Sequence, residues 1–278
     1  MIGNNVALLS AAAMLFFAAN SLLCRMAIAP GLIDPISFST VRVLAAIAVL
    51  SLVVVFRRGR WPKLGYAKLK SVSALFAYLV TFPLAYERLG AGIGAIVLFA
   101  VVQFTMFAVA LYEGERFTHV AWLGLVASGT ALVFLMLPSG GSGDPLGLAL
   151  MTICGVAWGG FCLLARDVDH PVEANASNFI FCLPLILLAN VTGLSNISVT
   201  AEGLWLAVAA GGVATAIGYI VWYQAIKLLS ASRAAVVQLS VPVLAAIGGA
   251  VFLSETLALQ SIIASIVVLG GIGAVLSQ

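Results

Sequence analysis

The sequence predicts an all-α integral membrane protein of ten transmembrane helices, arranged as two inverted five-helix repeats. Composition is the first reason: 63% of the 278 residues are hydrophobic, 8% are charged and the mean hydropathy is +1.18, whereas soluble domains carry about 25% charged residues. The second reason is that apolar runs of about 20 residues, enough to span a bilayer, follow one another along the chain. The third is a pattern of residues that recurs in both halves.

The recurring pattern has a nearly constant offset. The segment Leu22–Arg25 returns 141 residues later as Leu163–Arg166. A second set returns 140 residues later: Ala91, Ala95, Val97 and Glu115 as Ala231, Ala235, Val237 and Glu255. The predicted repeats are therefore residues 1–138 and 144–278. Because each repeat has five spans, an odd number, the second repeat lies upside down in the membrane relative to the first. Inverted repeats are typical of transporters, whose halves rock about a site at the membrane midplane.

Charge, proline or glycine bounds each of the five helices predicted for the first half. The first helix has no basic segment before it and is long enough to span, so it is expected to be retained and not cleaved as a signal peptide. The second follows Asp34-Pro35, an N-cap acceptor and a residue suited to the first turn, and stops at Arg57. In chain order the ranges are Val6–Ala27, Pro35–Phe56, Leu69–Glu87, Ala91–Tyr112 and His119–Leu137.

The helices of the second half have the same kinds of boundary. Asp144-Pro145 opens the sixth helix as Asp34-Pro35 opens the second, and His170-Pro171 marks the entry to the seventh. In chain order the ranges are Pro145–Ala165, Glu173–Gly193, Gly203–Lys227, Ser232–Leu253 and Thr256–Leu276. The connections are too short for a soluble catalytic or nucleic-acid-binding domain.

The basic residues predict the orientation. Ten of the thirteen Lys and Arg residues fall on the side that holds both termini, most of them in the Arg57–Lys70 connection. The positive-inside rule makes that side cytoplasmic. We therefore expect a multi-pass protein of the bacterial inner (plasma) membrane with its N- and C-termini in the cytoplasm. The small net charge of +3 reflects this orientation and does not indicate a nucleic-acid partner.

The sequence predicts no enzyme, no cofactor and no metal site. The segment Gly141–Asp144 matches the Gly-x-Gly-Asp pattern of intramembrane aspartyl proteases, but those enzymes need a second aspartate in the membrane. Here the other aspartates lie in connections, so a glycine-rich linker is the better interpretation. The cysteines lie in apolar helices without a Cys-x-x-Cys pair and are expected to pack as small residues: Cys24, Cys154, Cys162 and Cys182.

Several motifs together resemble the EamA-type carriers of the drug/metabolite transporter superfamily. They are Phe17–Asn20 ahead of Arg25, Arg42 in the second helix, Gly114-Glu115 and Ser254-Glu255 after helices that begin with small residues, and the glycine-rich fifth and tenth helices. The resemblance covers essentially the whole chain and implies a ten-helix fold that transports small metabolites. The aromatic middle, with Tyr78, Phe99 and Trp158, looks most like the YddG-type amino-acid exporters.

Aromatic and polar residues inside the helices are the predicted substrate-binding residues. Tyr78, Phe82 and Tyr86 lie four residues apart on one face of the third helix. Polar side chains within spans cost free energy against lipid, so they should face the interior or a wet cavity. The predicted set is Phe17, Asn20, Tyr78, Phe82, Phe99, Gln103, Trp158, Tyr219, Gln238 and Ser240. Packing among aromatic side chains, or a belt facing lipid, is the alternative.

Charges and prolines supply the predicted structural and gating residues. Arg42 lies about 10 Å into the second helix. A pair with Glu87 is the favoured interpretation for it, and docking of a substrate carboxylate is the alternative. Glu115 and Glu255 are expected to brace helix ends, with gate contacts as the alternative. The prolines expected to allow helix bending are Pro83, Pro184 and Pro242.

These features predict an inner-membrane transporter that exports small amphipathic metabolites by alternating access, above all neutral and aromatic amino acids. Its expected partners are the substrate and the lipid bilayer, and it is expected to be a monomer. Uniport is predicted because no titratable carboxylate or histidine falls near the midplane. The alternatives are a proton-coupled drug/metabolite antiporter, if Glu87 or Glu115 lies deeper, and a membrane scaffold or receptor that transports nothing.

Overall fold

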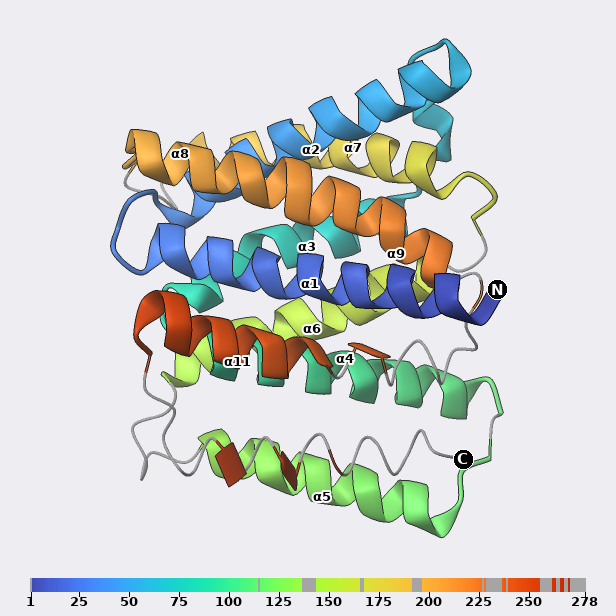
Figure 1. The fold of residues 1–278 in the computed structure, drawn as a ribbon, viewed down its shortest axis with the longest axis vertical. Helices are drawn as coiled ribbons and strands as arrows, with labels where there is room; N and C mark the ends of the chain where they lie inside the picture. Colours follow the sequence, from blue (N-terminus) through green and yellow to red (C-terminus); the bar gives the residue numbers. More distant parts are fainter. Residues whose placement is uncertain are drawn as a thin grey trace.

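The protein is almost entirely helical (Figure 1). The computed structural model describes residues 2–114, 116–136, 144–165, 168–191, 197–226, 228, 237–238, 240–255, 262–263, 266–267 and 270. Its elements are α1 (Ile2–Ile28), α2 (Pro35–Arg58), η1 (Leu64–Tyr66), α3 (Leu69–Tyr86), α4 (Ala91–Tyr112), α5 (His119–Met136), α6 (Pro145–Ala165), α7 (Pro171–Val191), α8 (Ala201–Val208), η3 (Ala209–Ile217), α9 (Gly218–Ile226) and α11 (Ser240–Leu253).

Seven helices in this described part are long and apolar enough to cross a membrane. They are Val6–Ile28, Pro35–Arg58, Leu69–Tyr86, Ala91–Tyr112, Pro145–Ala165, Pro171–Val191 and Ala201–Ile226. This confirms the all-α membrane class. The ten-helix count and the inverted repeat stay predictions, because most of the ninth and tenth predicted spans outside Ser240–Leu253 lies beyond the described residues.

Helix boundaries follow the local signals in the sequence. Helices α4 and α6 begin and end at the predicted residues. Asp34 caps α2, because its side chain accepts a hydrogen bond of 2.9 Å from the amide of Ser37. Gly59 ends the same helix in the left-handed conformation, with φ of 66°, and its amide bonds to the carbonyl of Val55.

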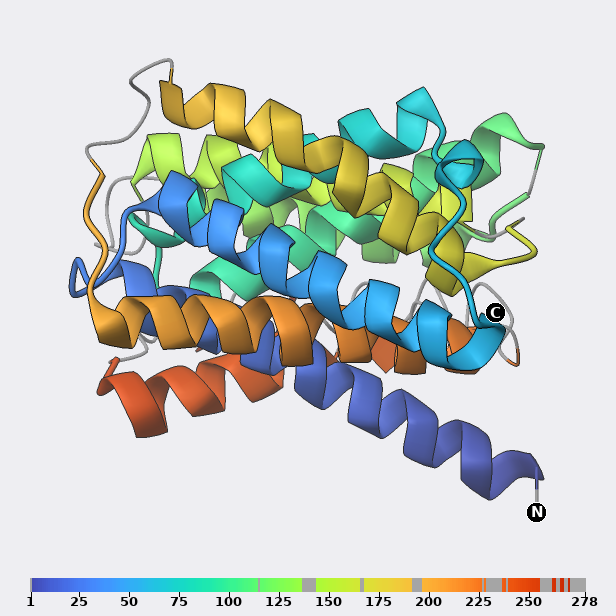
Figure 2. The same cartoon turned by 90° about the horizontal axis from the view of Figure 1, so that it is seen from above.

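The helices run in nearly parallel and antiparallel directions, so their ends gather at two ends of the bundle (Figure 1). We call one the Arg25 end; it holds the α1–α2 connection, the start of α8 and the end of α11. The other, the Arg58 end, holds the α2–α3 connection and the start of α7. Helix α3 packs against α6 and α7, α2 against α7 and η3, and α11 against α1 and α4. Figure 2 shows α1 crossing the bundle obliquely, with its first turns directed away from it.

The eighth predicted span is one continuous helix whose middle segment, η3, is π-helical. This segment crosses α2 at very short distance beside Arg42. A methyl group on Gly211 would overlap the carbonyl oxygen of Arg42 and lie 2.8 Å from its Cα. Only glycine permits this contact between backbones, which brings η3 against the one arginine in the centre of α2.

We expect Gly211→Ala to destabilise the protein by about 1–3 kcal/mol or more, since the added methyl meets backbone that cannot move aside easily. Gly160→Ala in α6 is the matched control, because nothing lies within 4 Å of the added methyl. There alanine should be neutral or stabilising by about 0.5–1 kcal/mol. Both variants are heated in detergent, and the fraction that stays folded is measured by size-exclusion chromatography. The difference between their thermal midpoints gives the difference in stability. Equal midpoints for the two variants would contradict the close crossing.

Candidate functional site

A small buried cavity lies at the centre of the bundle. Its volume is about 20 Å³, and it lies among α1, α3, α4, α6, η3 and α9. The lining residues are Phe17, Asn20, Ser21, Tyr78, Phe82, Leu98, Phe99, Trp158, Ala214 and Tyr219. The cavity therefore lies between elements of the two predicted repeats.

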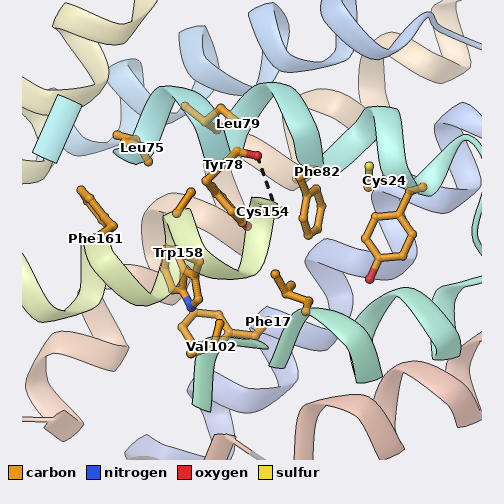
Figure 3. Close-up of a cluster of buried hydrophobic side chains, with 14 of the residues drawn as sticks. Phe17, Cys24, Leu75, Tyr78, Leu79, Phe82, Val102, Cys154, Trp158 and Phe161 are labelled. Atoms are coloured by element: carbon orange, nitrogen blue, oxygen red, sulfur yellow. Dashed lines mark hydrogen bonds between the residues drawn. The ribbon is translucent and has the colours of Figure 1, made fainter. Parts of the chain in front are cut away.

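Trp158 is the centre of the aromatic lining (Figure 3). Its ring centroid lies 5.0 Å from that of Tyr78, 5.1 Å from that of Tyr219 and 5.9 Å from that of Phe17. Tyr78 also contacts Phe82 at 5.2 Å, one turn along α3. These contacts join α1, α3, α6 and α9 around a single cavity.

The cavity is closed around a space for about one water molecule. Ring contacts of this kind are favourable, by about 0.5–1.5 kcal/mol per pair beyond the buried area. Any organic ligand has to separate some of these rings before it enters.

Four polar side chains close a ring of hydrogen bonds beside the cavity. Arg42 donates through Nε to Thr215 Oγ1 at 3.0 Å and through Nη2 to the Tyr78 hydroxyl at 3.0 Å. Asn20 donates to the same hydroxyl at 3.2 Å and accepts from Thr215 at 3.4 Å. Each residue comes from a different element, α1, α2, α3 or η3. The ring of hydrogen bonds therefore depends on the spacing of these four elements.

Arg42 is fully buried, with 0% of its surface exposed. Its guanidinium carbon lies 5.2 Å from the ring centroid of Tyr78 and 5.1 Å from that of Phe82, within the range of cation–π attraction. The predicted pair with Glu87 is wrong: Glu87 is exposed at the end of α3, whereas the guanidinium points to the bundle centre. Neutral hydroxyls and ring faces surround the charge instead.

The structure brings seven of the ten predicted substrate-binding residues to this one cavity. They are Phe17, Asn20, Tyr78, Phe82, Phe99, Trp158 and Tyr219. Gln103 and Gln238 are buried but are absent from the described residues that line it. Ser240 was expected to face the interior, and this is wrong: it is exposed and donates to the carbonyl of Val237 at 2.8 Å, which satisfies its hydroxyl locally.

The predicted hinge prolines lie in different settings. Pro83 is buried inside α3 and Pro184 is exposed inside α7. Pro242 lies in the first turn of α11 as described, where a proline removes no hydrogen bond within that segment. Glu115 falls outside the described residues.

A partly buried ion pair lies at the Arg25 end. Arg25 Nε lies 3.0 Å from Glu255 Oε1, with 20% and 19% of the two side chains exposed, and Arg25 Nη1 donates to the carbonyl of Tyr86 at 2.7 Å. Glu255 Oε2 accepts from the amide of Ala91 at 2.8 Å, so the carboxylate caps the start of α4. Glu255 thus braces a helix end as expected, and this arrangement ties α1, α3 and α4 to the segment after α11.

A second pair at the Arg25 end joins Arg88 and Asp144 at 2.6 Å, nearer the surface. The hydrogen bond from Arg88 keeps the pKa of the Asp144 carboxyl below its ordinary value. Exposed pairs of this kind contribute little to stability. The partly buried Arg25–Glu255 pair is therefore the stronger of the two contacts at this end.

The Arg58 end has a larger cavity of about 250 Å³ among α2, α7 and α9. Arg58, His170 and Tyr223 are among its lining residues. Tyr223 lies one helical turn from Tyr219, which lines the central cavity. This cavity, called the vestibule below, and the aromatic site therefore lie beside successive turns of α9.

Glu173 anchors the start of α7 at the same end. It is 2% exposed and accepts from Arg60 Nη1 at 2.6 Å and from the amide of Lys63 at 3.0 Å. Sequence reasoning names Glu173 only as the first residue of the seventh predicted helix and gives it no role. It also missed Thr215, whose signal was a lone hydroxyl within the small apolar stretch Ala209–Ile217.

Comparisons with known proteins agree with this architecture. The model of the EamA-like transporter family matches residues 4–137 and 145–277. An uncharacterized protein of Pseudomonas aeruginosa is 40% identical over 278 residues, covering 97% of this chain and 94% of the relative. An uncharacterized transporter of Archaeoglobus fulgidus is 23% identical over 248 residues, covering 86% and 88%. A solved crystal structure shares the fold, with a TM-score of 0.65 at 19% identity over 95% of this chain and 98% of that one.

Proposed function

This chain belongs to the EamA-like transporter family of the drug/metabolite transporter superfamily, and on that premise we propose that it exports small amphipathic metabolites by alternating access. The observation that carries the proposal is the central cavity between elements of the two predicted repeats, lined by Trp158 and six further aromatic and polar residues that the sequence singles out. Neutral and aromatic amino acids are among the amphipathic metabolites that its rings and hydroxyls suit.

Unequal closure of the two ends supports alternating access. The Arg25 end is tied by the partly buried Arg25–Glu255 pair, while the Arg58 end retains the vestibule of about 250 Å³, whose lining residue Tyr223 lies one helical turn from Tyr219. In an alternating carrier the described form is the one that admits substrate from the Arg58 end. Breaking the Arg25–Glu255 pair and closing the vestibule would then release substrate at the other end.

The direction of export depends on orientation, for which we propose a cytoplasmic Arg58 end. Reporter domains fused after Gln278 and within Arg57–Lys70 should both show a cytoplasmic location, because basic residues cluster on that side. A fusion within residues 193–201 should show the opposite location. A C-terminal reporter that is active only outside the cell would contradict this orientation and the ten-helix count.

The proposal is tested with purified protein in liposomes, loaded one at a time with radiolabelled neutral and aromatic amino acids at matched pH on both sides. We expect net efflux down the substrate gradient and counterflow without any imposed proton or sodium gradient, because none of the described residues lining the cavity is a carboxylate or histidine. Flux that requires a proton gradient, and that Glu87→Gln uncouples, would support the proton-coupled antiporter instead. No flux of any amino acid would remove the amino-acid assignment.

A further inference from the structure

Arg42 carries a buried positive charge that no described carboxylate neutralises. The four ion pairs among the described residues involve Arg25, Arg58, Arg60 and Arg88, and none includes Arg42. Its Nη1 has no hydrogen-bond partner although the side chain is 0% exposed. A guanidinium in this setting is costly unless something offsets it.

The neighbours of Arg42 offset only part of that cost. Thr215 and Tyr78 each accept one hydrogen bond from Arg42, and the faces of the Tyr78 and Phe82 rings lie against its charge. All of these groups are neutral. Arg42 therefore leaves one net positive charge beside the cavity, and its Nη1 still has a hydrogen bond to donate.

The charge lies directly behind the wall of the central cavity. Tyr78 and Phe82 line the cavity and also contact the guanidinium, and Asn20 lines it while sharing the hydrogen-bond ring. No aspartate or glutamate is among the described lining residues, so the cavity offers no counter-charge to an ammonium group. Its electrostatics favour an anion over a zwitterion.

We propose that Arg42 binds the carboxylate of the substrate, and that the preferred substrates are compact aromatic or apolar monocarboxylates, such as arylalkanoates and 2-oxo or 2-hydroxy acids, ahead of the amino acids with the same side chain. This inference rests on the proposed function and narrows its substrate class. The rings around Trp158 receive the apolar body. The carboxylate takes the donors on Nη1 and Nη2 when the cavity expands and the Tyr78 hydroxyl gives up its bond to Nη2.

The remaining contact with Thr215 gives this binding its geometry. Thr215 holds Nε and so restricts the orientation of the guanidinium, while Nη2 is directed at the hydroxyl of Tyr78, a residue that lines the cavity. The planar fork formed by Nη1 and Nη2 matches the two oxygens of a carboxylate, and charge-assisted pairs of this kind are about twice as strong as neutral hydrogen bonds. A lysine at position 42 would keep the charge and lose the fork.

The test compares three ligands that share a phenyl ring: 3-phenylpropanoate as the anion, phenylalanine as the zwitterion and phenethylamine as the cation. Isothermal titration of the purified protein in detergent measures each Kd and avoids passive permeation of the weak acid. We expect the anion to bind about tenfold or more tightly than phenylalanine, because phenylalanine has to bury an ammonium group for which the described lining residues offer no carboxylate. Phenethylamine, which has the ammonium group and no carboxylate, should bind weakest.

Variants locate the preference at Arg42. Arg42→Gln should abolish the preference for 3-phenylpropanoate over phenylalanine. Arg42→Lys should retain that preference but bind the anion more weakly. Thr215→Val, which removes only the contact to Nε, should weaken binding of the anion and leave the Kd of phenethylamine unchanged. If Arg42→Gln does not fold, this variant tests the role of Arg42 in its place. Arg88→Gln is the matched control, since Arg88 lies exposed at the Arg25 end, and it should change nothing.

The outcomes separate this inference from the proposed function. If phenylalanine binds as tightly as 3-phenylpropanoate, or if phenethylamine binds best, the inference is overturned while the aromatic site stands. If the preference survives both Arg42→Gln and Thr215→Val, the charge that selects the anion lies elsewhere. If none of the three ligands binds, the aromatic site fails and this inference fails with it.

Discussion

Trp158→Ala is expected to reduce the affinity for aromatic substrates by tenfold or more, the largest effect of any single change at the site. Trp158 contacts rings on three other elements, α1, α3 and α9, so its loss removes the surface on which an apolar side chain would lie. Truncating a buried tryptophan also costs about 3–5 kcal/mol of stability. Affinity must therefore be measured on the fraction that elutes as folded protein in detergent.

Two further variants make the Trp158 measurement decisive. Trp158→Phe keeps a ring at the centre of the cluster and should recover most of the binding. Trp205→Ala removes a tryptophan that is 70% exposed on α8 and should leave both stability and transport unchanged. Normal uptake kinetics in folded Trp158→Ala would show that substrate binds outside the aromatic cavity.

Glu255→Gln is expected to shift the protein toward a form that is open at the Arg25 end. The change weakens a partly buried charged contact with Arg25 and the cap on Ala91. Charged hydrogen bonds contribute about 1.5–3 kcal/mol, and 1.4 kcal/mol already changes a population ratio tenfold. The opening can be measured by the rate at which a membrane-impermeant maleimide labels Ser21→Cys, which lines the central cavity, in a background without the native cysteines.

The labelling experiment has its own controls. Arg25→Gln should raise the rate as Glu255→Gln does, and the double variant should show less than the sum of the two effects, because both remove the same contact. Glu202→Gln changes an exposed glutamate at the same end and should have no effect. Unchanged labelling in both Arg25→Gln and Glu255→Gln would mean that another contact holds this end closed.

The helices could be predicted from the sequence because a single apolar segment of about 20 residues can satisfy all its backbone hydrogen bonds within a bilayer only as a helix, so that apolar length defines a span. Local signals then place the ends, as with Asp34 before α2 and with both ends of α4. Spacing also predicted one face of α3: the rings of Tyr78, Phe82 and Tyr86 contact one another in series at 5.2 and 4.8 Å.

The contacts of Arg42 could not be predicted in the same way. Its partner Thr215 lies 173 residues away, and their contact depends on how closely η3 approaches α2 at Gly211. Sequence reasoning offered a carboxylate on the same side of the membrane, Glu87, but that residue lies past the last turn of α3 in an exposed position. Ser240 failed for a different reason, because a serine can satisfy its hydroxyl on its own backbone and then face outward.

Under the proposed alternating access, the charge of Arg42, which no described carboxylate neutralises, would make the carrier respond to the membrane potential. In a form closed at the Arg25 end, Arg42 would experience the electrical potential of the compartment at the Arg58 end. In a form closed at the Arg58 end, it would experience the potential of the other compartment. Moving one charge through the whole field changes the free energy by about 2.3 kcal/mol per 100 mV. With the proposed cytoplasmic Arg58 end and a negative interior, the resting voltage would favour the form that is open to the Arg58 end, and a bound substrate anion would cancel that bias.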